Sequence, residues 1–237
     1  MHRTEMTTPD AMSTQYASTG RLATRRGVWG PGPEGVSPTD VLRQTVVDAA
    51  PHSVVEIGCG TGHLARSILD ALPEVTYLAT DLSRAMVEST AAVGVPAVVA
   101  AAHELPVPDQ SCDVAVAAWM LYHVPDLETV LTELRRVLRP GGTLVVATNG
   151  ESHLAGLLRE AGGEPLVTQF TSEVAGPLLR RHFGDVAQRD IETRASFDDH
   201  AAAAAYLATF DEGLAGALPP FDGPRSYAGH TAILTAR

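Results

Sequence analysis

Short apolar runs alternate with helix-length segments through the middle of this chain, starting at Ser53. Such alternation is typical of βαβ units, which build a parallel sheet with helices on its faces. With 237 residues and 45% hydrophobic content, the chain can form one large α/β domain, but not two domains of ordinary size without a visible linker. We expect strands at residues 53–57, 75–80, 97–100, 112–118 and 143–148, and two later ones at 186–194 and 230–236.

The helices are predicted from apolar spacing and from capping residues. A helix over about 126–138 has the strongest pattern, because its leucines and valines recur at the three- and four-residue spacing of one helix face. Ser37 and Pro38 favour a helix start and predict a helix that ends near Ala50. Later helices are expected to end at Gly162-Gly163, to lie near 172–182, and to cover the alanine-rich segment 198–211.

The stretch VVEIGCGTGHLA, residues 54–65, places an acid and three glycines between the first of these strands and a helix. Glycines allow a tight turn in which a ligand touches the main chain. The dinucleotide fingerprint G-x-G-x-x-G would need glycine at position 63, where His63 stands. A pyrophosphate binds helix N-terminal N–H groups and tolerates an acid poorly, so Glu56 favours a cationic ligand without phosphate.

A second acid, Asp81, follows the strand after the glycine loop. At the carboxyl end of that strand, its carboxylate could accept hydrogen bonds from both hydroxyls of a ribose. Enzymes that use nicotinamide dinucleotides place an acid similarly, so Asp81 alone does not decide between the two cofactor classes.

Charge and composition exclude several other functions. Seventeen basic against 28 acidic residues give a net charge of −11, which disfavours nucleic acid and anionic membrane surfaces as partners. All the basic residues are arginines, so a lysine Schiff base and a P-loop lysine are absent. Two cysteines, no apolar N-terminal signal and no long apolar run predict a cytoplasmic protein. No clustered ligand spacing or acidic cluster calls for a metal ion.

Four ordered stretches resemble the class I S-adenosylmethionine-dependent methyltransferases, especially the type that includes the ubiquinone/menaquinone biosynthesis C-methyltransferases. They are VVEIGCGTGHLA, ATDLSRAMVE, HELPVPDQSCDVAVAAWMLYHVPD and ELRRVLRPGGTLVVAT, and together they cover roughly residues 53–148. The resemblance implies a Rossmann-like sheet of seven mostly parallel strands with helices on both faces. It also implies that the last strand, 230–236, is antiparallel and inserted.

The same resemblance implies S-adenosylmethionine as cofactor and assigns residues to its parts. The glycine loop would hold the methionine part, Asp81 the ribose, and Leu82 the adenine face. At the adenine edge the family commonly has an acid where Ala101 stands, so backbone groups or His103 would serve there. The residues expected to bind the cofactor are Glu56, Gly58, Cys59, Gly60, Gly62, Asp81, Leu82, Ala102, His103 and Trp119.

Methyl transfer from a sulfonium is a single in-line displacement, so the protein must align donor and acceptor and remove the acceptor's proton. Candidate bases are expected at the carboxyl ends of the fourth and fifth strands, which selects His153, His123 and Tyr122. For His123 a structural role in its loop, and for Tyr122 a role as pocket wall, stand beside the catalytic one. Two rival functions stay open, a nucleoside-cofactor-binding protein without catalysis and an NAD-dependent oxidoreductase.

The chain is expected to divide at about residue 36. Residues 1–36 are predicted as a flexible tail and lid segment, in which Arg21, Arg25 or Arg26 could pair with the cofactor carboxylate. Residues 37–237 are the expected methyltransferase domain, with a cofactor-binding core at 53–148 and a substrate-shaping part at 149–237. The expected partner is a small-molecule methyl acceptor, and the lysine-free, alanine-rich composition suggests a role in bacterial secondary metabolism. The acceptor, the methylated atom and the oligomeric state stay open.

Overall fold

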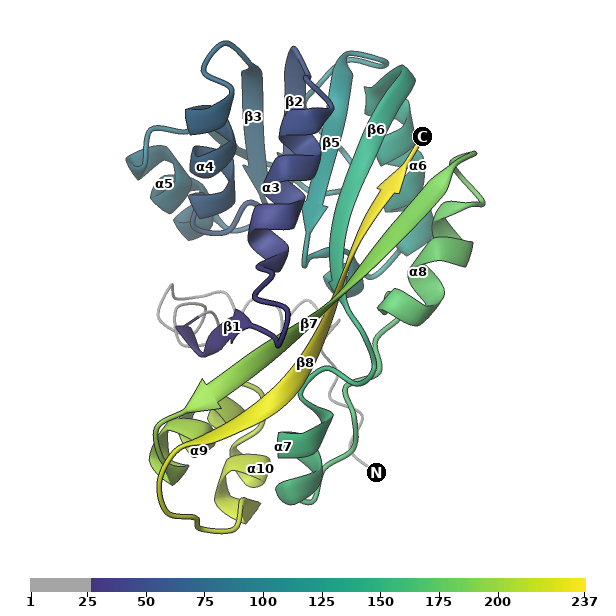
Figure 1. Ribbon diagram of the computed structural model, residues 1–237. Helices are drawn as coiled ribbons and strands as arrows, with labels where there is room; N and C mark the ends of the chain where they lie inside the picture. Colours follow the sequence, from purple (N-terminus) through teal and green to yellow (C-terminus); the bar gives the residue numbers. More distant parts are fainter. Residues whose placement is uncertain (1–26) are drawn as a thin grey trace.

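A computed structural model describes residues 27–237, which form a single mixed sheet flanked by helices (Figure 1). The sheet has eight strands in the order β1-β7-β8-β6-β5-β2-β3-β4. The strands are β1 (Trp29–Pro31), β2 (Ser53–Ile57), β3 (Thr76–Asp81), β4 (Ala97–Val99), β5 (Cys112–Ala118), β6 (Leu138–Asn149), β7 (Val186–Phe197) and β8 (Arg225–Ala236).

The helices lie between these strands in the chain, as the alternating pattern predicts. They are α3 (Pro38–Asp48), α4 (His63–Ala71), α5 (Arg84–Ala92), α6 (Leu127–Val137), α7 (Ala155–Glu160), α8 (Ser172–Leu179), α9 (His200–Ala208) and α10 (Glu212–Ala217), with a 3₁₀ turn at Leu121–His123. Side-chain caps fix several of their starts. Ser37 accepts a hydrogen bond from the N–H of Asp40 at α3, and Asp126 accepts one from the N–H of Thr129 at α6.

The strand directions confirm the predicted fold class. Strands β2 to β6 pair in parallel, and β8 is antiparallel to both β6 and β7, between which it is inserted. The predicted number of seven strands is one too low for the described residues, because β1 adds an antiparallel strand at the edge of β7. Residues 29–31 fall in the segment expected as tail and lid, and the sequence gives no signal for a pairing with β7.

Two apolar layers cover the two faces of the sheet. Val54 and Val145 pack with α3 and α4 on one face, whereas Val55 and Val146 pack with α6 and α8 on the other. Neighbouring residues of a strand point to opposite faces, so strands covered on both sides read as continuous apolar runs. This explains why the five predicted core strands lack polar alternation.

A third apolar cluster lies outside this three-layer core. The long hairpin of β7 and β8 continues past the parallel strands, and α7, α9 and α10 pack around its far end (Figure 1). Phe197, Tyr206 and Leu207 are buried there. We call this part, residues 154–161 and 197–227, the hairpin lobe.

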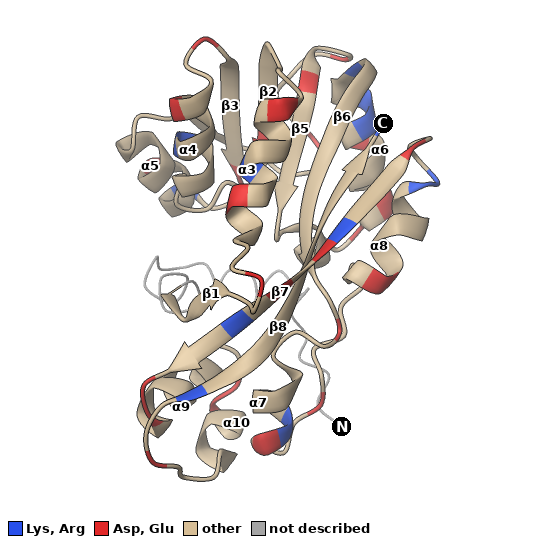
Figure 2. Cartoon of the chain, viewed as in Figure 1, with Lys and Arg blue, Asp and Glu red and all other residues tan. Residues whose placement is uncertain are grey.

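Acidic and basic residues are interspersed along the sheet, the helices and the lobe of the described chain in Figure 2. None of the helices within residues 27–237 is long and apolar enough to cross a membrane.

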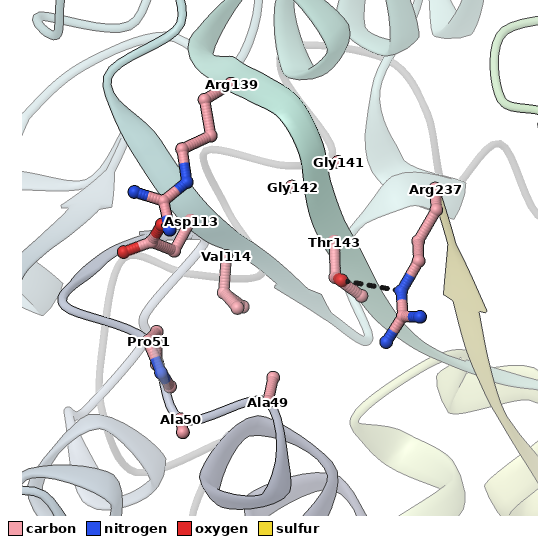
Figure 3. Close-up of a pocket in the computed structure, with 10 residues that line it drawn as sticks. All are labelled: Ala49, Ala50, Pro51, Asp113, Val114, Arg139, Gly141, Gly142, Thr143 and Arg237. Carbon is pink, nitrogen blue, oxygen red and sulfur yellow. Dashed lines mark hydrogen bonds and ion pairs between the residues drawn. The ribbon is translucent and has the colours of Figure 1, made fainter.

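Asp113 joins three strands at the edge of the sheet where the parallel strands begin. Its Oδ2 accepts hydrogen bonds from the N–H groups of His52 and Ser53, at 2.8 and 2.9 Å. Figure 3 shows the Arg139 guanidinium against the same carboxylate, beside a cavity of about 290 Å³. Asp113 is buried, so it stabilises the start of β2 through charge-assisted hydrogen bonds.

We therefore expect Asp113→Asn to lower the free energy of unfolding by about 2 kcal/mol, because the amide loses the ion pair and keeps only part of the acceptor capacity. Urea unfolding at pH 7 measures this change. Asp109→Asn is the matched control, since Asp109 pairs with Arg136 at 2.6 Å but is 75% exposed. Equal losses in the two variants would contradict the role given to Asp113.

Candidate active site

One large cavity, of about 1170 Å³, opens at the carboxyl ends of the parallel strands. Its inner end is formed by Glu56, the glycine loop and Asp81, and its outer end reaches β1, β7 and the hairpin lobe. The edge at which parallel strands end is the usual ligand-binding edge of an open α/β sheet. The cavity therefore lies at the sheet edge where the sequence predicts the cofactor to bind.

The glycine loop has a backbone that few other residues would adopt. Gly58, Gly60 and Gly62 have φ of 71°, 57° and 76°, in the left-handed region. The N–H groups of Gly58 and Cys59 both donate to the carbonyl oxygen of Thr80, at 2.8 and 3.0 Å. These bonds hold the loop across the end of β3.

Two glycines also prevent steric overlap. A Cβ on Gly58 would lie 2.8 Å from Cβ of Met120, and one on Gly62 would lie 2.9 Å from Cα of Thr90. Gly58 and Gly60 line the cavity, whereas Gly62 does not and instead forms the N-cap of α4. Gly62 thus supports the loop from behind rather than facing a ligand.

Cys59 lines the cavity but is a buried packing residue. Its Sγ lies 3.3 Å from Oγ1 of Thr90, and burial raises the pKa of the thiol to about 12. A thiol with this pKa is not a nucleophile near neutral pH.

The two predicted acids lie close to the loop. Glu56 is 1% exposed and accepts a hydrogen bond from the Tyr77 hydroxyl at 2.9 Å. Asp81 accepts from the N–H groups of Gly60 and Ser83, at 3.0 and 2.9 Å. Burial raises the pKa of Asp81, while these N–H bonds oppose the rise. Two carboxylates at one end of the cavity suit a ligand with positive charge and hydroxyl groups.

The expected adenine end has an apolar face and lacks an acid. Leu82, directly after Asp81, is 70% exposed and lines the cavity. Ala101, Ala102 and His103 form the neighbouring wall. An apolar side chain left open beside the acid that is expected to bind the ribose provides a surface for a flat base. Polar contacts to that base would have to come from the backbone or from His103.

Trp119 is held at the centre of the cavity by a network that the sequence did not predict. Its φ is 54°, and its N–H donates to the carbonyl oxygen of Ala147 at 2.8 Å. The indole Nε1–H donates to Oδ1 of Asn149 at 3.2 Å, and the same oxygen accepts from the Thr231 hydroxyl at 3.0 Å. Asn149 ends β6 and Thr231 lies on β8, so only the antiparallel pairing of the last strand brings them together.

The three candidate bases all line the cavity, at different depths. The Tyr122 and His123 rings are edge to face with centroids 4.4 Å apart, and His123 is 5% exposed. His153 lies at the outer end, where its ring stacks on Trp29 with centroids 4.2 Å apart. The structure therefore places the candidates around one cavity without selecting the base.

His153 is fixed to the backbone of β8. Its Nδ1 lies 3.1 and 3.2 Å from the carbonyl oxygen and the amide nitrogen of His230. Burial lowers the pKa of His153 to about 4, the hydrogen bond to the His230 backbone opposes this shift, and the charge of His230 adds a smaller lowering. The imidazole is therefore neutral at pH 7 and can accept a proton, although it is a weak base.

This shift predicts a pH dependence of stability. The unfolded chain binds a proton at this histidine below about pH 6.5, whereas the folded protein does so only near pH 4. The stabilising contribution is therefore complete above pH 6.5 and decreases on acidification, by about 2 kcal/mol between pH 7 and pH 5. Urea unfolding of the wild type and of His153→Gln at both pH values isolates this contribution. Identical pH dependence in the two proteins would contradict the lowered pKa of His153.

The sequence also gave little indication of the aromatic residues at the outer end. Tyr206 and Phe210, from the alanine-rich segment, line the cavity together with Trp29 of β1. The alanine-rich segment 198–211, predicted as a helix, thus contributes two aromatic side chains to the wall of the cavity. Arg21, Arg25 and Arg26, considered for the lid, lie outside the described residues.

The comparisons with known proteins agree with this geometry. Residues 55–146, which hold the glycine loop, Asp81 and Trp119, match a family model described as a methyltransferase domain. This part of the chain is a methyltransferase domain. This domain implies S-adenosylmethionine as its cofactor, and the cradle of left-handed glycines, the two acids and the open apolar side chain of Leu82 fit that molecule.

Two named relatives match 112 and 162 residues of this chain. The chain is 34% identical over 112 residues to malonyl-[acyl-carrier protein] O-methyltransferase of Methylococcus capsulatus, covering 45% of this chain and 41% of the relative. It is 32% identical over 162 residues to the 23S rRNA (guanine(748)-N(1))-methyltransferase of Streptomyces fradiae, covering 67% of this chain and 55% of the relative. The chain thus spans about half the length of these relatives.

Solved structures share the fold at low sequence identity. The [4+2]-cyclase SpnF superposes with a TM-score of 0.65 at 18% identity, and the match covers 95% of this chain and 94% of that one. The YcgJ protein of Bacillus subtilis gives 0.61 with 18% identity, covering 83% and 97%. At this identity the likeness shows the fold, and the chemistry has to be argued from the site.

Proposed function

We propose that this protein transfers a methyl group from S-adenosylmethionine to an oxygen, nitrogen or carbon atom of a small molecule. The observation that carries the proposal is a single cavity of about 1170 Å³ that extends from the glycine loop and Asp81 to the rings of Trp29, Tyr206 and Phe210. We call the part lined by these rings the outer chamber. A donor bound at the glycine loop would leave this chamber open to an acceptor. The sulfonium supplies an activated methyl group, so the chain's own task is alignment and proton removal.

The proposed division of labour follows the positions of the residues. Glu56 and the glycine loop would bind the amino-acid part, Asp81 the ribose hydroxyls, and Leu82 with Ala102 and His103 the adenine. Trp119, fixed by Asn149, would contact the bound cofactor from the cavity wall. The division of the chain into a lid segment, a cofactor-binding core at 53–148 and a substrate-shaping part at 149–237 belongs to the same proposal.

We place the base at His153, because it faces the outer chamber as a neutral imidazole with its Nδ1 fixed by β8. His123 lies deeper and Tyr122 contributes to the wall. A small acceptor also agrees with the net charge of −11, which opposes binding of nucleic acid. Two free buried cysteines agree with a reducing, cytoplasmic environment.

The test is incubation of the purified chain with methyl-labelled S-adenosylmethionine and fractionated small-molecule extracts, followed by mass spectrometry. The proposal predicts a product heavier by one labelled methyl group. With that acceptor, His153→Gln should lower kcat at least a hundredfold at pH 7 while cofactor affinity changes less than threefold, since general-base catalysis contributes about 10² to 10⁴. Full kcat in this variant would contradict the base assignment, and cofactor binding without any product would favour the non-catalytic alternative.

A further inference from the structure

The outer chamber is built from uncharged side chains. Aromatic rings of Trp29, Tyr206 and Phe210 form one part of it, and hydroxyl-bearing Thr168, Thr193 and Thr231 form another. No arginine is among the described residues that line the cavity, and its carboxylates are Glu56, Asp81 and Asp126. Of residues 27–237, those that line the chamber thus offer a ligand rings and hydroxyls and no arginine.

The rings are held in place by contacts between distant segments. The Trp29 Nε1–H donates to the Tyr206 hydroxyl at 3.2 Å, and the two rings are edge to face at 6.5 Å. On its stacked side Trp29 contacts His153, and Tyr206 packs on Phe210 with centroids 5.3 Å apart. Rings fixed in this way form a rigid apolar wall, which suits a flat ligand because little side-chain entropy is lost on binding.

The hydroxyl of Thr193 is a polar group that lacks a hydrogen bond within residues 27–237. The residue is 5% exposed and lines the cavity, and its Oγ1 has no hydrogen-bond partner among the described residues. Gly229 leaves room for this hydroxyl and for the Trp29 ring, since a Cβ there would lie 2.3 Å from each. A buried hydroxyl without a hydrogen-bond partner is unfavourable. A ligand oxygen beside Trp29 would therefore gain a stabilising hydrogen bond with the Thr193 hydroxyl.

Resting on the proposed function, we infer that the acceptor is an uncharged, flat molecule that carries a hydroxyl or carbonyl oxygen. Its ring packs on the wall of Trp29, Tyr206 and Phe210, and its oxygen bonds with Thr193. A free carboxylate in the same place would be desolvated without a cationic partner and would face the acids of the inner end. The chamber therefore discriminates against anionic acceptors.

The test is calorimetric titration of the full chain, saturated with S-adenosylhomocysteine, with two probes of matched shape. Methyl 6-hydroxy-2-naphthoate is neutral, and 6-hydroxy-2-naphthoate, the carboxylate of the parent acid, is its anionic counterpart at pH 7. S-adenosylhomocysteine lacks the sulfonium, so charge discrimination comes from the protein. We expect saturable binding of the ester and at least tenfold weaker binding of the acid.

Failure of this inference and failure of the proposed function give different results. If S-adenosylhomocysteine binds but the ester does not, or if the acid binds as tightly as the ester, the acceptor class is wrong and the proposed function stands. If S-adenosylhomocysteine itself does not bind, the proposed function is wrong, whatever the result with the ester.

Thr193→Val tests the hydroxyl directly. The variant should weaken binding of the ester at least threefold with an unchanged or higher Tm, because the lost hydroxyl has no protein partner. Thr148→Val is the matched control, since the Thr148 hydroxyl is buried and donates to the carbonyl oxygen of Phe170 at 2.6 Å. It should lower Tm and leave binding of the ester unchanged. Unchanged binding of the ester by Thr193→Val would contradict the role of Thr193.

Discussion

Replacing Asp81 by alanine should lower the affinity for S-adenosylmethionine more than tenfold, at least about 1.4 kcal/mol. Asp81 is placed to accept hydrogen bonds from ribose hydroxyls, and it also accepts from the N–H groups of Gly60 and Ser83. Its loss would therefore remove contacts to the ligand and loosen the loop that holds the methionine part. Calorimetric titration of wild type and variant measures the change.

Asp70→Ala is the matched control for this variant. Asp70 pairs with Arg66 at 2.7 Å on the exposed side of α4, and neither residue lines the cavity. The control should change the affinity less than twofold, since exposed ion pairs contribute little. An Asp81→Ala protein with wild-type affinity would show that this carboxylate does not bind the ribose.

The second large effect is expected at Gly62. Alanine there must adopt a φ of 76°, which costs about 1–2 kcal/mol, and must displace Thr90, which adds about 1–3 kcal/mol. The free energy of unfolding should therefore fall by about 2–5 kcal/mol, and cofactor affinity should fall with it, because α4 and the glycine loop shift together.

Gly162→Ala separates the two costs. Gly162 has the same φ of 76°, but a Cβ there meets nothing within 4 Å. It should lose only the backbone part, about 1–2 kcal/mol, and keep its cofactor affinity. Urea unfolding of both variants gives the comparison. Equal losses of unfolding free energy in the two variants would mean that steric overlap with Thr90 adds nothing to the cost of Gly62→Ala.

The sequence predicted the features that depend on local pattern. Continuous apolar runs predicted the five parallel strands, and the positions of Glu56, Gly58 and Asp81 at strand ends predicted that they would share one sheet edge. Each of these follows from residues within one βαβ unit, so the periodicity and turn chemistry suffice.

The outer chamber could not be predicted in the same way. Trp29 meets Tyr206 across 177 positions of the chain, and His153 meets His230 across 77. These contacts depend on β1 pairing with β7 and on the hairpin of β7 and β8 reaching past the sheet. No local spacing encodes such pairings. The sequence could select His153 as a candidate but could not reveal its stacking partner or its lowered pKa.

The most direct test of the account is calorimetric titration of the purified chain with S-adenosylmethionine and, separately, with NADH. The glycine loop with His63 after it, and the acids Glu56 and Asp81 at its two sides, predict saturable binding of S-adenosylmethionine with one site per chain and no binding of NADH. Binding of NADH without binding of S-adenosylmethionine would contradict the assignment of this cavity to S-adenosylmethionine.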